Sequence, residues 1–348
     1  MSTLKNAFVH FFMVMVVIAT VGCTKKDSNE VNLAIWGSYL APEMVEKFQK
    51  ETGIKMNVSN YTSNEELLAK VQAGSGGIDV SVPSDYMVQI MAKLNLLEPL
   101  DMALITNKDH FDPIWMNQPF DPGNKFSLPY AWSTAGIAVN RDLYKGEIKD
   151  WKDVFENPEL NGKFSLLDDV REVMAMALKY HGASVNSVEV SELEKAKAFL
   201  LKIKPNVKMF RSDTVESLVN KEVAVAHAYS SDALMASAQT NGKIEYILPA
   251  SGGTRAMDNL VIFKNSKNKE NAYRLIDFLS SQESNLMFVT RSKVGPVLKT
   301  TKEALPVEMK NNKSLFPEAK VLSLFENIND LGENTKLYDA IWTSVKSE

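Results

Sequence analysis

Short apolar strands alternate with amphipathic helices along this chain, and that alternation constrains the fold more than any other feature. The first predicted strands span 31–36, 54–59 and 78–83, and the helices after them begin near Pro42, Asn64 and Ser84. A β-α-β-α-β-α order with short connections is typical of a parallel sheet covered by helices on both faces. This part of the chain is therefore expected to form an α/β lobe.

The same alternation returns in the second half of the chain with different spacing. Its predicted strands span 164–167, 207–210, 223–229, 244–248 and 260–263, and its predicted helices span 170–181, 188–203, 215–220, 232–240 and 269–279. No single linker divides the halves, because residues 98–127 are rich in Asp, Asn and Pro but lack a flexible-linker composition. Two lobes joined by several short crossings fit this pattern.

The only cysteine of the chain, Cys23, closely follows an apolar run over residues 7–20. A basic start, an apolar stretch too short to span a bilayer and a small residue before the cut are typical of a secretory signal, so residues 1–22 are predicted to be a signal peptide. Thr20-Val21-Gly22-Cys23 resembles the lipobox of bacterial lipoproteins, which implies that Cys23 is lipidated and that residues 23–30 form a tether. An ordinary cleaved signal and an uncleaved anchor are the alternatives. We expect an exported, membrane-anchored lipoprotein of the periplasm or cell envelope.

The size and charge of the predicted mature chain narrow the classes of function. Removing 22 of the 348 residues leaves 326, which is above the length at which one hydrophobic core usually divides. The 39 basic and 43 acidic side chains give a net charge of −4, which is too small to indicate a nucleic-acid partner. We therefore expect a two-lobed body that does not bind nucleic acid.

Aromatic and acidic residues recur where the predicted strands end, which is where open α/β sheets bind ligands. Buried carboxylates need a compensating cation, while aromatic faces attract ammonium groups and pack against methylenes. The set therefore suits an organic amine. The candidate ligand-binding residues are Trp36, Tyr39, Ser84, Tyr86, Asp169, Glu172, Tyr229 and Asp258.

Several candidates also have a purely structural interpretation. Ser84 and Asp169 are of types that commonly cap helices, and Glu172 lies in the first turn of a predicted helix. A hard cation held by Asp168, Asp169, Glu172 and Asp258 is conceivable, but these residues lack the regular spacing of a calcium loop. The chain has no G-x-S-x-G, H-E-x-x-H or phosphate-loop motif, so no catalysis, metal or cofactor is predicted.

Several motifs resemble those of the substrate-binding proteins of bacterial polyamine ABC transporters, the spermidine/putrescine-binding type. The run Asp168-Asp169-x-Arg171-Glu172-Val173 is the most particular to that family. The other motifs are Trp36-x-x-Tyr39, Phe48-x-Lys50-Glu51-Thr52-Gly53-Ile54, Val82-Pro83-Ser84, Pro119-Phe120-Asp121-Pro122, Pro129-Tyr130-x-Trp132, Asn157-Pro158-Glu159-Leu160-x-Gly162-Lys163, Gly252-Gly253 and Met257-Asp258.

The resemblance implies an α/β fold of the two-lobed periplasmic-binding-protein type (type II). Each lobe would hold a mixed, mostly parallel sheet flanked by helices, and the ligand cleft would lie between the lobes, which close by a hinge. Residues 31–132 and 255–300 would form the first lobe, and residues 133–254 and 301–348 the second. The implied partners are a small cationic amine and the permease subunits of an ABC importer, with the receptor itself a monomer.

The resemblance also assigns roles to the candidate residues. The first lobe would line the cleft with Trp36, Tyr39, Ser84 and Tyr86. Asp169 and Glu172 would meet amine groups from the second lobe, and Asp258 would hold the inner amine. Tyr229 takes the place of a family tryptophan and keeps a ring there.

Four positions depart from the family pattern and leave the ligand open: Gly37, Ala256, Lys293 and Ile328. By the resemblance, Ala256 takes the place of a tryptophan in the cleft wall. Lys293 aligns with a cleft tyrosine and is therefore predicted to lie in the cleft, where it would repel a polyamine unless a carboxylate paired with it. A shorter diamine, an amino-acid-like or thiamine-like solute and a ferric carrier are the alternatives among binding proteins. An envelope hydrolase and a sensor that uses the same cleft are the alternatives from other classes.

Overall fold

The computed structural model describes residues 29–37, 39–74 and 77–347. The predicted signal peptide, the lipidation at Cys23 and most of the tether lie outside these residues. Among the helices of this part of the chain, none is both long enough and apolar enough to cross a membrane.

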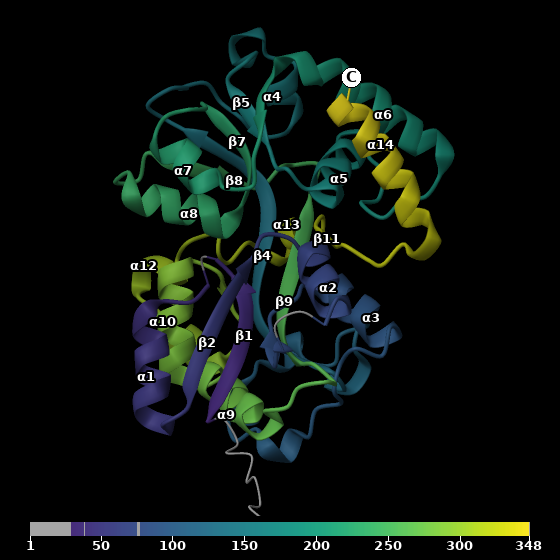
Figure 1. The fold of residues 1–348 in the computed structure, drawn as a ribbon. Coiled ribbons are helices and arrows are strands. Elements are labelled where there is room, and N and C mark those ends of the chain that lie inside the picture. The colour runs from purple at the N-terminus through teal and green to yellow at the C-terminus, as the bar shows by residue number, and fades with distance from the viewer. Residues whose placement is uncertain (1–28, 38, 75–76, 348) are drawn as a thin grey trace, which may run out of the picture.

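The structure confirms the predicted two-lobed α/β architecture, and Figure 1 shows one lobe above the other. The first lobe begins with β1 (Glu30–Trp36), α1 (Pro42–Thr52), β2 (Lys55–Tyr61), α2 (Asn64–Gln72), β3 (Val80–Ser81) and α3 (Asp85–Lys93). Strand β1 pairs with β2 and β3 in parallel, as the β-α-β order predicts. The loop-like segment before residue 127 contains only short 3₁₀ turns.

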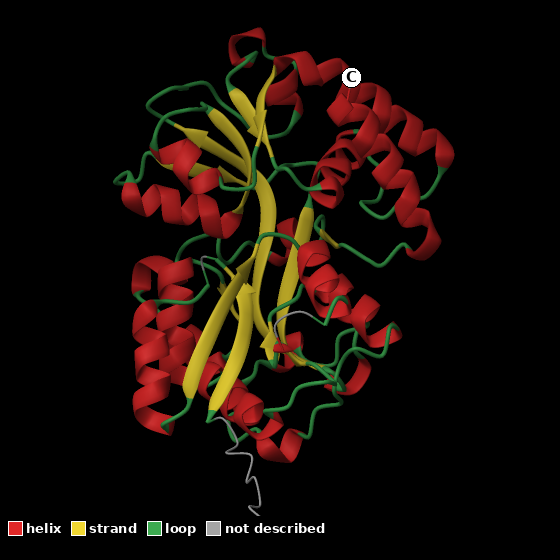
Figure 2. Ribbon diagram, viewed as in Figure 1, coloured by secondary structure: helices red, strands yellow, loops and turns green. Residues whose placement is uncertain are grey.

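The second lobe repeats this arrangement with its own sheet and core. Its elements are α4 (Lys152–Phe155), β5 (Phe164–Leu166), α5 (Val170–Tyr180), α6 (Val190–Ile203), β6 (Val207–Phe210), α7 (Thr214–Val219), β7 (Val225–Tyr229), α8 (Ser230–Gln239) and β8 (Ile244–Ile247). Strands β6, β5 and β7 run parallel, and helices flank them (Figure 2). The cores of the two lobes are separate clusters of buried side chains.

Two strands pass between the lobes, β4 (Ser127–Asn140) and β9 (Thr254–Ile262). Residues 127–134 of β4 pair with β9, and residues 135–140 pair with β7 and β8. Every residue of β4 is buried, and partner strands pair with both of its edges at residues 131–132 and 137–139. The sheet is therefore continuous, in the order β2-β1-β3-β9-β4-β7-β5-β6.

The C-terminal part of the chain first packs on the first lobe and then returns to the second. Its elements are α9 (Lys269–Leu279), α10 (Gln282–Ser292), β10 (Gly295–Pro296), α11 (Lys299–Ala304), α12 (Val307–Lys310), α13 (Ala319–Leu322), β11 (Glu326–Asn327) and α14 (Thr335–Ser347). Leu305 belongs to the core of the first lobe, whereas Tyr338 belongs to that of the second. The predicted boundary at residue 300 thus differs from the packing, which places a third crossing near β11.

Candidate functional site

A cavity of about 500 Å³ lies between the lobes, and eight of the nine predicted ligand-binding residues line it. These eight are Trp36, Tyr39, Ser84, Tyr86, Asp169, Glu172, Tyr229 and Asp258. Most of them lie at strand ends and helix starts of the two lobes, as expected for the carboxyl edge of an α/β sheet, whereas Asp258 lies in the middle of β9. The structure therefore brings together residues that are far apart in the sequence.

Asp258 on β9 is 7% exposed and accepts two hydrogen bonds from hydroxyl groups of the first lobe. The Tyr39 hydroxyl donates to Oδ2 at 2.5 Å, and the Ser84 hydroxyl donates to Oδ1 at 2.8 Å. Burial raises the pKa of the Asp258 carboxyl from 3.8 to about 6, and the two hydrogen bonds oppose that rise. Ser84 is the N-cap residue of α3, but its side chain makes no cap hydrogen bond, so the predicted capping role is wrong.

Asp169 and Glu172 lie at the start of α5 in the second lobe. Asp169 caps the helix as predicted, because its Oδ1 accepts from the backbone N–H of Arg171 at 2.8 Å and of Glu172 at 3.1 Å. The Glu172 carboxylate accepts from the Thr254 hydroxyl at 2.6 Å. Burial, and then the charge of Asp169, raise the pKa of Glu172 from 4.5 to about 8. Burial also raises the pKa of Asp169.

Charge is strongly unbalanced in the cavity wall. Seven carboxylates line the cavity, and the single cationic side chain among the lining residues is Arg171. The guanidinium of Arg171 donates to the Asn329 carbonyl at 3.0 Å and to the Asn186 side-chain oxygen at 3.2 Å. One of these seven carboxylates, Asp168, pairs with Lys346 of α14 at 2.9 Å. Asp169, Glu172 and Asp258 have no ion pair within 4 Å in the described part of the chain, so the wall suits a cationic guest.

Aromatic rings frame these carboxylates. The Trp36 indole N–H donates to the Val82 carbonyl at 2.8 Å, and its ring lies 4.5 Å from that of Tyr61. The Tyr86 hydroxyl donates to Glu65 at 2.9 Å. Burial raises the pKa of Tyr229 well above its ordinary value, and the charges of Glu172 and Asp169 add to that effect. Ring faces beside carboxylates are the surroundings that stabilise ammonium groups.

Asp232 on α8 is a carboxylate of this wall that is not among the predicted ligand-binding residues. Its Oδ2 accepts from the Thr214 hydroxyl at 2.9 Å, and burial raises its pKa from 3.8 to about 6. The sequence does contain a signal for Asp232, because this residue comes three positions after Tyr229, the last residue of β7. Asp232 therefore lies one helical turn away from the Tyr229 ring. Asp213 also lines the cavity. Neither residue is among the predicted ligand-binding residues.

The structure corrects the predicted position of Lys293. Lys293 ends α10 with a left-handed backbone (φ 55°), and it is not among the residues that line the cavity. The prediction that Lys293 lies in the cleft is therefore wrong for this structure. Ala256 and Ile328, by contrast, do line the cavity. The expected repulsion between an internal lysine and a bound amine has no basis in this arrangement.

Metal coordination is not what this geometry favours. Over residues 29–37, 39–74 and 77–347, no group of three or more His, Cys, Asp or Glu side chains is arranged to hold a metal ion. The cavity carboxylates are spread over α3, α5, α8, β9 and the turns before α5 and α7. They therefore do not form a compact loop of the kind that holds calcium.

Comparisons with known proteins agree with this arrangement. Residues 43–317 match the model of the bacterial extracellular solute-binding protein family. The spermidine/putrescine-binding periplasmic protein of Salmonella typhimurium is 36% identical to this chain over 325 residues, which are 92% of this chain and 92% of that protein.

Solved structures are similar along almost the whole chain. The spermidine/putrescine ABC transporter substrate-binding protein PotD of Streptococcus pneumoniae has a TM-score of 0.79 at 30% identity, covering 91% of this chain and 98% of that one. A PotD lipoprotein of Treponema pallidum has a TM-score of 0.81 at 26% identity, covering 91% and 99%. These similarities confirm the predicted periplasmic-binding-protein fold.

Proposed function

This chain belongs to the bacterial extracellular solute-binding proteins, and from that premise we propose that its cavity binds a small organic polyamine for an ABC importer. The observation that carries the proposal is the cavity wall, in which seven carboxylates face a single guanidinium. A guest of opposite charge offsets the cost of burying such carboxylates. Solute binding involves no covalent step, and the family is one of receptors rather than enzymes.

The placement of the carboxylates favours a guest with more than one ammonium group. Asp258 lies with Tyr39 and Ser84 on the first-lobe side, whereas Glu172 lies on α5 of the second lobe. Asp232 adds a third position on α8, which lies on the opposite side of β4 from α5 (Figure 1). Putrescine and spermidine, which the names of the relatives mention, carry ammonium groups separated by methylenes and match this pattern.

Ala256 influences which polyamine the cavity accepts. A tryptophan expected from the family pattern would narrow the cavity there and add a ring face, and alanine does neither. We therefore propose that binding depends mainly on carboxylates, with Trp36 and Tyr229 as the principal rings. An amino-acid-like or thiamine-like solute is the alternative guest.

The setting of the receptor follows from the same proposal. We propose that the protein is exported to the periplasm, anchored through a lipid on Cys23, and that it delivers its solute to permease subunits as a monomer. The lipoprotein title of the Treponema pallidum relative and the periplasmic names of the others support this proposal.

Calorimetry of the purified protein with putrescine and spermidine tests the ligand. We expect saturable binding of at least one of them, with a matching rise in thermal stability because the ligand binds only the folded state. Neutral and acidic amino acids and thiamine serve as comparison solutes. Tighter binding of any of these than of both polyamines would overturn the proposed ligand, and turnover of generic esters or peptides would favour the hydrolase alternative.

A further inference from the structure

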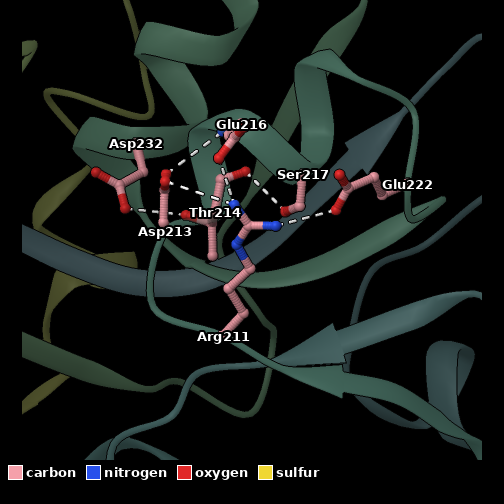
Figure 3. A network of polar contacts seen from close by, with 7 residues as sticks. All are labelled: Arg211, Asp213, Thr214, Glu216, Ser217, Glu222 and Asp232. Carbon is pink, nitrogen blue, oxygen red and sulfur yellow. Dashed lines mark hydrogen bonds and ion pairs between the residues drawn. The ribbon is translucent and has the colours of Figure 1, made fainter.

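Arg211, which directly follows β6, is surrounded by three carboxylates (Figure 3). Its guanidinium contacts Glu216, lies 3.1 Å from Glu222 through Nη1, and lies 3.6 Å from Asp213 through Nη2. Two carboxylates are enough to compensate one guanidinium. The third and most distant partner, Asp213, is therefore the one that Arg211 can release at least cost.

Asp213 differs from the other two partners of Arg211 in its position. It lines the cavity, whereas Glu216 and Glu222 do not. Its side chain is 61% exposed, and its second contact, from the Glu216 backbone N–H at the start of α7, is also long at 3.5 Å. Both interactions that hold Asp213 are thus at the limit of their range, and the side chain borders free space on the cavity side.

Asp213 is also close to a carboxylate of the proposed binding wall. Thr214, the next residue, is fully buried and donates its hydroxyl to Asp232 at 2.9 Å (Figure 3). The charge of Asp213 contributes to the raised pKa of Asp232, so the two carboxylates repel each other across a short distance. A positive group between them would remove that repulsion.

We propose that Asp213 is an exchangeable ligand-binding residue, which leaves Arg211 and pairs with an ammonium group of the amine bound beside Asp232. Arg211 keeps Glu216 and Glu222 and so stays compensated after the exchange. Asp213 and Asp232 then form a second ammonium subsite on the α7–α8 side of the cavity, away from Asp169 and Glu172. This inference rests on the proposed function, because it deepens the description of the same site.

Neutralising two of the partners of Arg211 separately tests the proposal, with putrescine binding measured by calorimetry. Asp213→Asn is expected to raise the dissociation constant about three- to tenfold, the range of a partly exposed charge pair. The matched control Glu222→Gln removes a carboxylate from the same guanidinium but not from the cavity, and is expected to change the constant less than twofold. Asp213→Ser keeps an oxygen that can cap α7 and is expected to behave like Asp213→Asn.

The calorimetric results for these variants distinguish a ligand-binding role of Asp213 from a purely structural one. Equal weakening by Asp213→Asn and Glu222→Gln would mean that the Arg211 network acts only through structure, and the proposal would be wrong. Unchanged putrescine binding in both Asp213 variants would also overturn it, while leaving the proposed function intact. Failure of the unmodified protein to bind any polyamine would instead overturn the proposed function, and this inference with it.

Discussion

Replacing Asp258 by asparagine should stabilise the empty protein and weaken amine binding, two effects of opposite sign. A carboxyl group whose pKa rises from 3.8 to about 6 costs the folded state about 3 kcal/mol at pH 8, where it is ionised. Asparagine removes that cost. The NH₂ group of asparagine would, however, face one of the two hydroxyls that now donate to Asp258. The loss of that hydrogen bond offsets about 1 kcal/mol of the gain in stability. The variant is therefore expected to be about 1–2 kcal/mol more stable than the unmodified protein at pH 8.

The same substitution removes the carboxylate that we assign to the inner ammonium. Truncating one partner of a buried charge pair costs about 2–5 kcal/mol, so the dissociation constant for putrescine should rise at least about thirtyfold. Urea unfolding without ligand and calorimetry with putrescine measure the two effects. Glu46→Gln, an exposed carboxylate on α1, is the control for loss of charge alone. Loss of stability in Asp258→Asn at pH 8, or binding within threefold of the unmodified protein, would refute this reasoning.

Three further predictions concern pH and the cavity rings. A bound cation should lower the raised pKa of Glu172, so putrescine binding at pH 7 should release protons, and its affinity should increase from pH 6 to 8. Calorimetry in buffers of different ionisation enthalpy measures the number of protons released, and proton uptake would contradict the prediction. The protonated Glu172 stabilises the ligand-free fold by a few kcal/mol, and this contribution is complete below about pH 4.5 and lost as the pH rises through about 8. Urea unfolding at a series of pH values should show the decline in the free energy of unfolding. The variant Glu172→Gln should show a smaller decline. Tyr229→Leu keeps apolar volume but removes a ring face, so putrescine binding should weaken about three- to thirtyfold by calorimetry, and an unchanged constant would exclude a cation–π role.

Some residues that line the cavity could be predicted from the sequence because they lie at the ends of predicted strands. Trp36, Tyr86 and Asp169 were found because ligands of α/β sheets lie at strand ends, and strand ends are visible in the pattern of apolar runs. Asp213 has no such mark, since its place in the cavity wall depends on how α7 packs. Asp232 lies three residues beyond the strand end at Tyr229, but only the packing of α8 shows that it faces the cavity. Lys293 was placed in the cleft on the resemblance alone, and its position at the end of α10, outside the cavity lining, is a property of the folded chain.

The strands of the fold also differ in how well the sequence predicts them. Strands β1 and β5 are short apolar runs bounded by turn residues, and they were predicted almost to the residue. Strand β4 was not predicted, because a strand buried on all sides has no alternation of polar and apolar residues. Its pairing with partners from both lobes is a property of the assembled sheet rather than of its own sequence.

That long strand also determines how the halves of the protein can move against each other. Between Thr134 and Ala135, β4 stops pairing with β9 and begins pairing with β7, so the ladder on either side of this point belongs to one half only. A twist of the backbone there would leave the rungs of both ladders paired, while the bonds that join Thr134 to Ser230 and Tyr246 would have to adjust. We therefore expect the two walls to approach a guest by bending β4 at this point rather than by breaking the sheet.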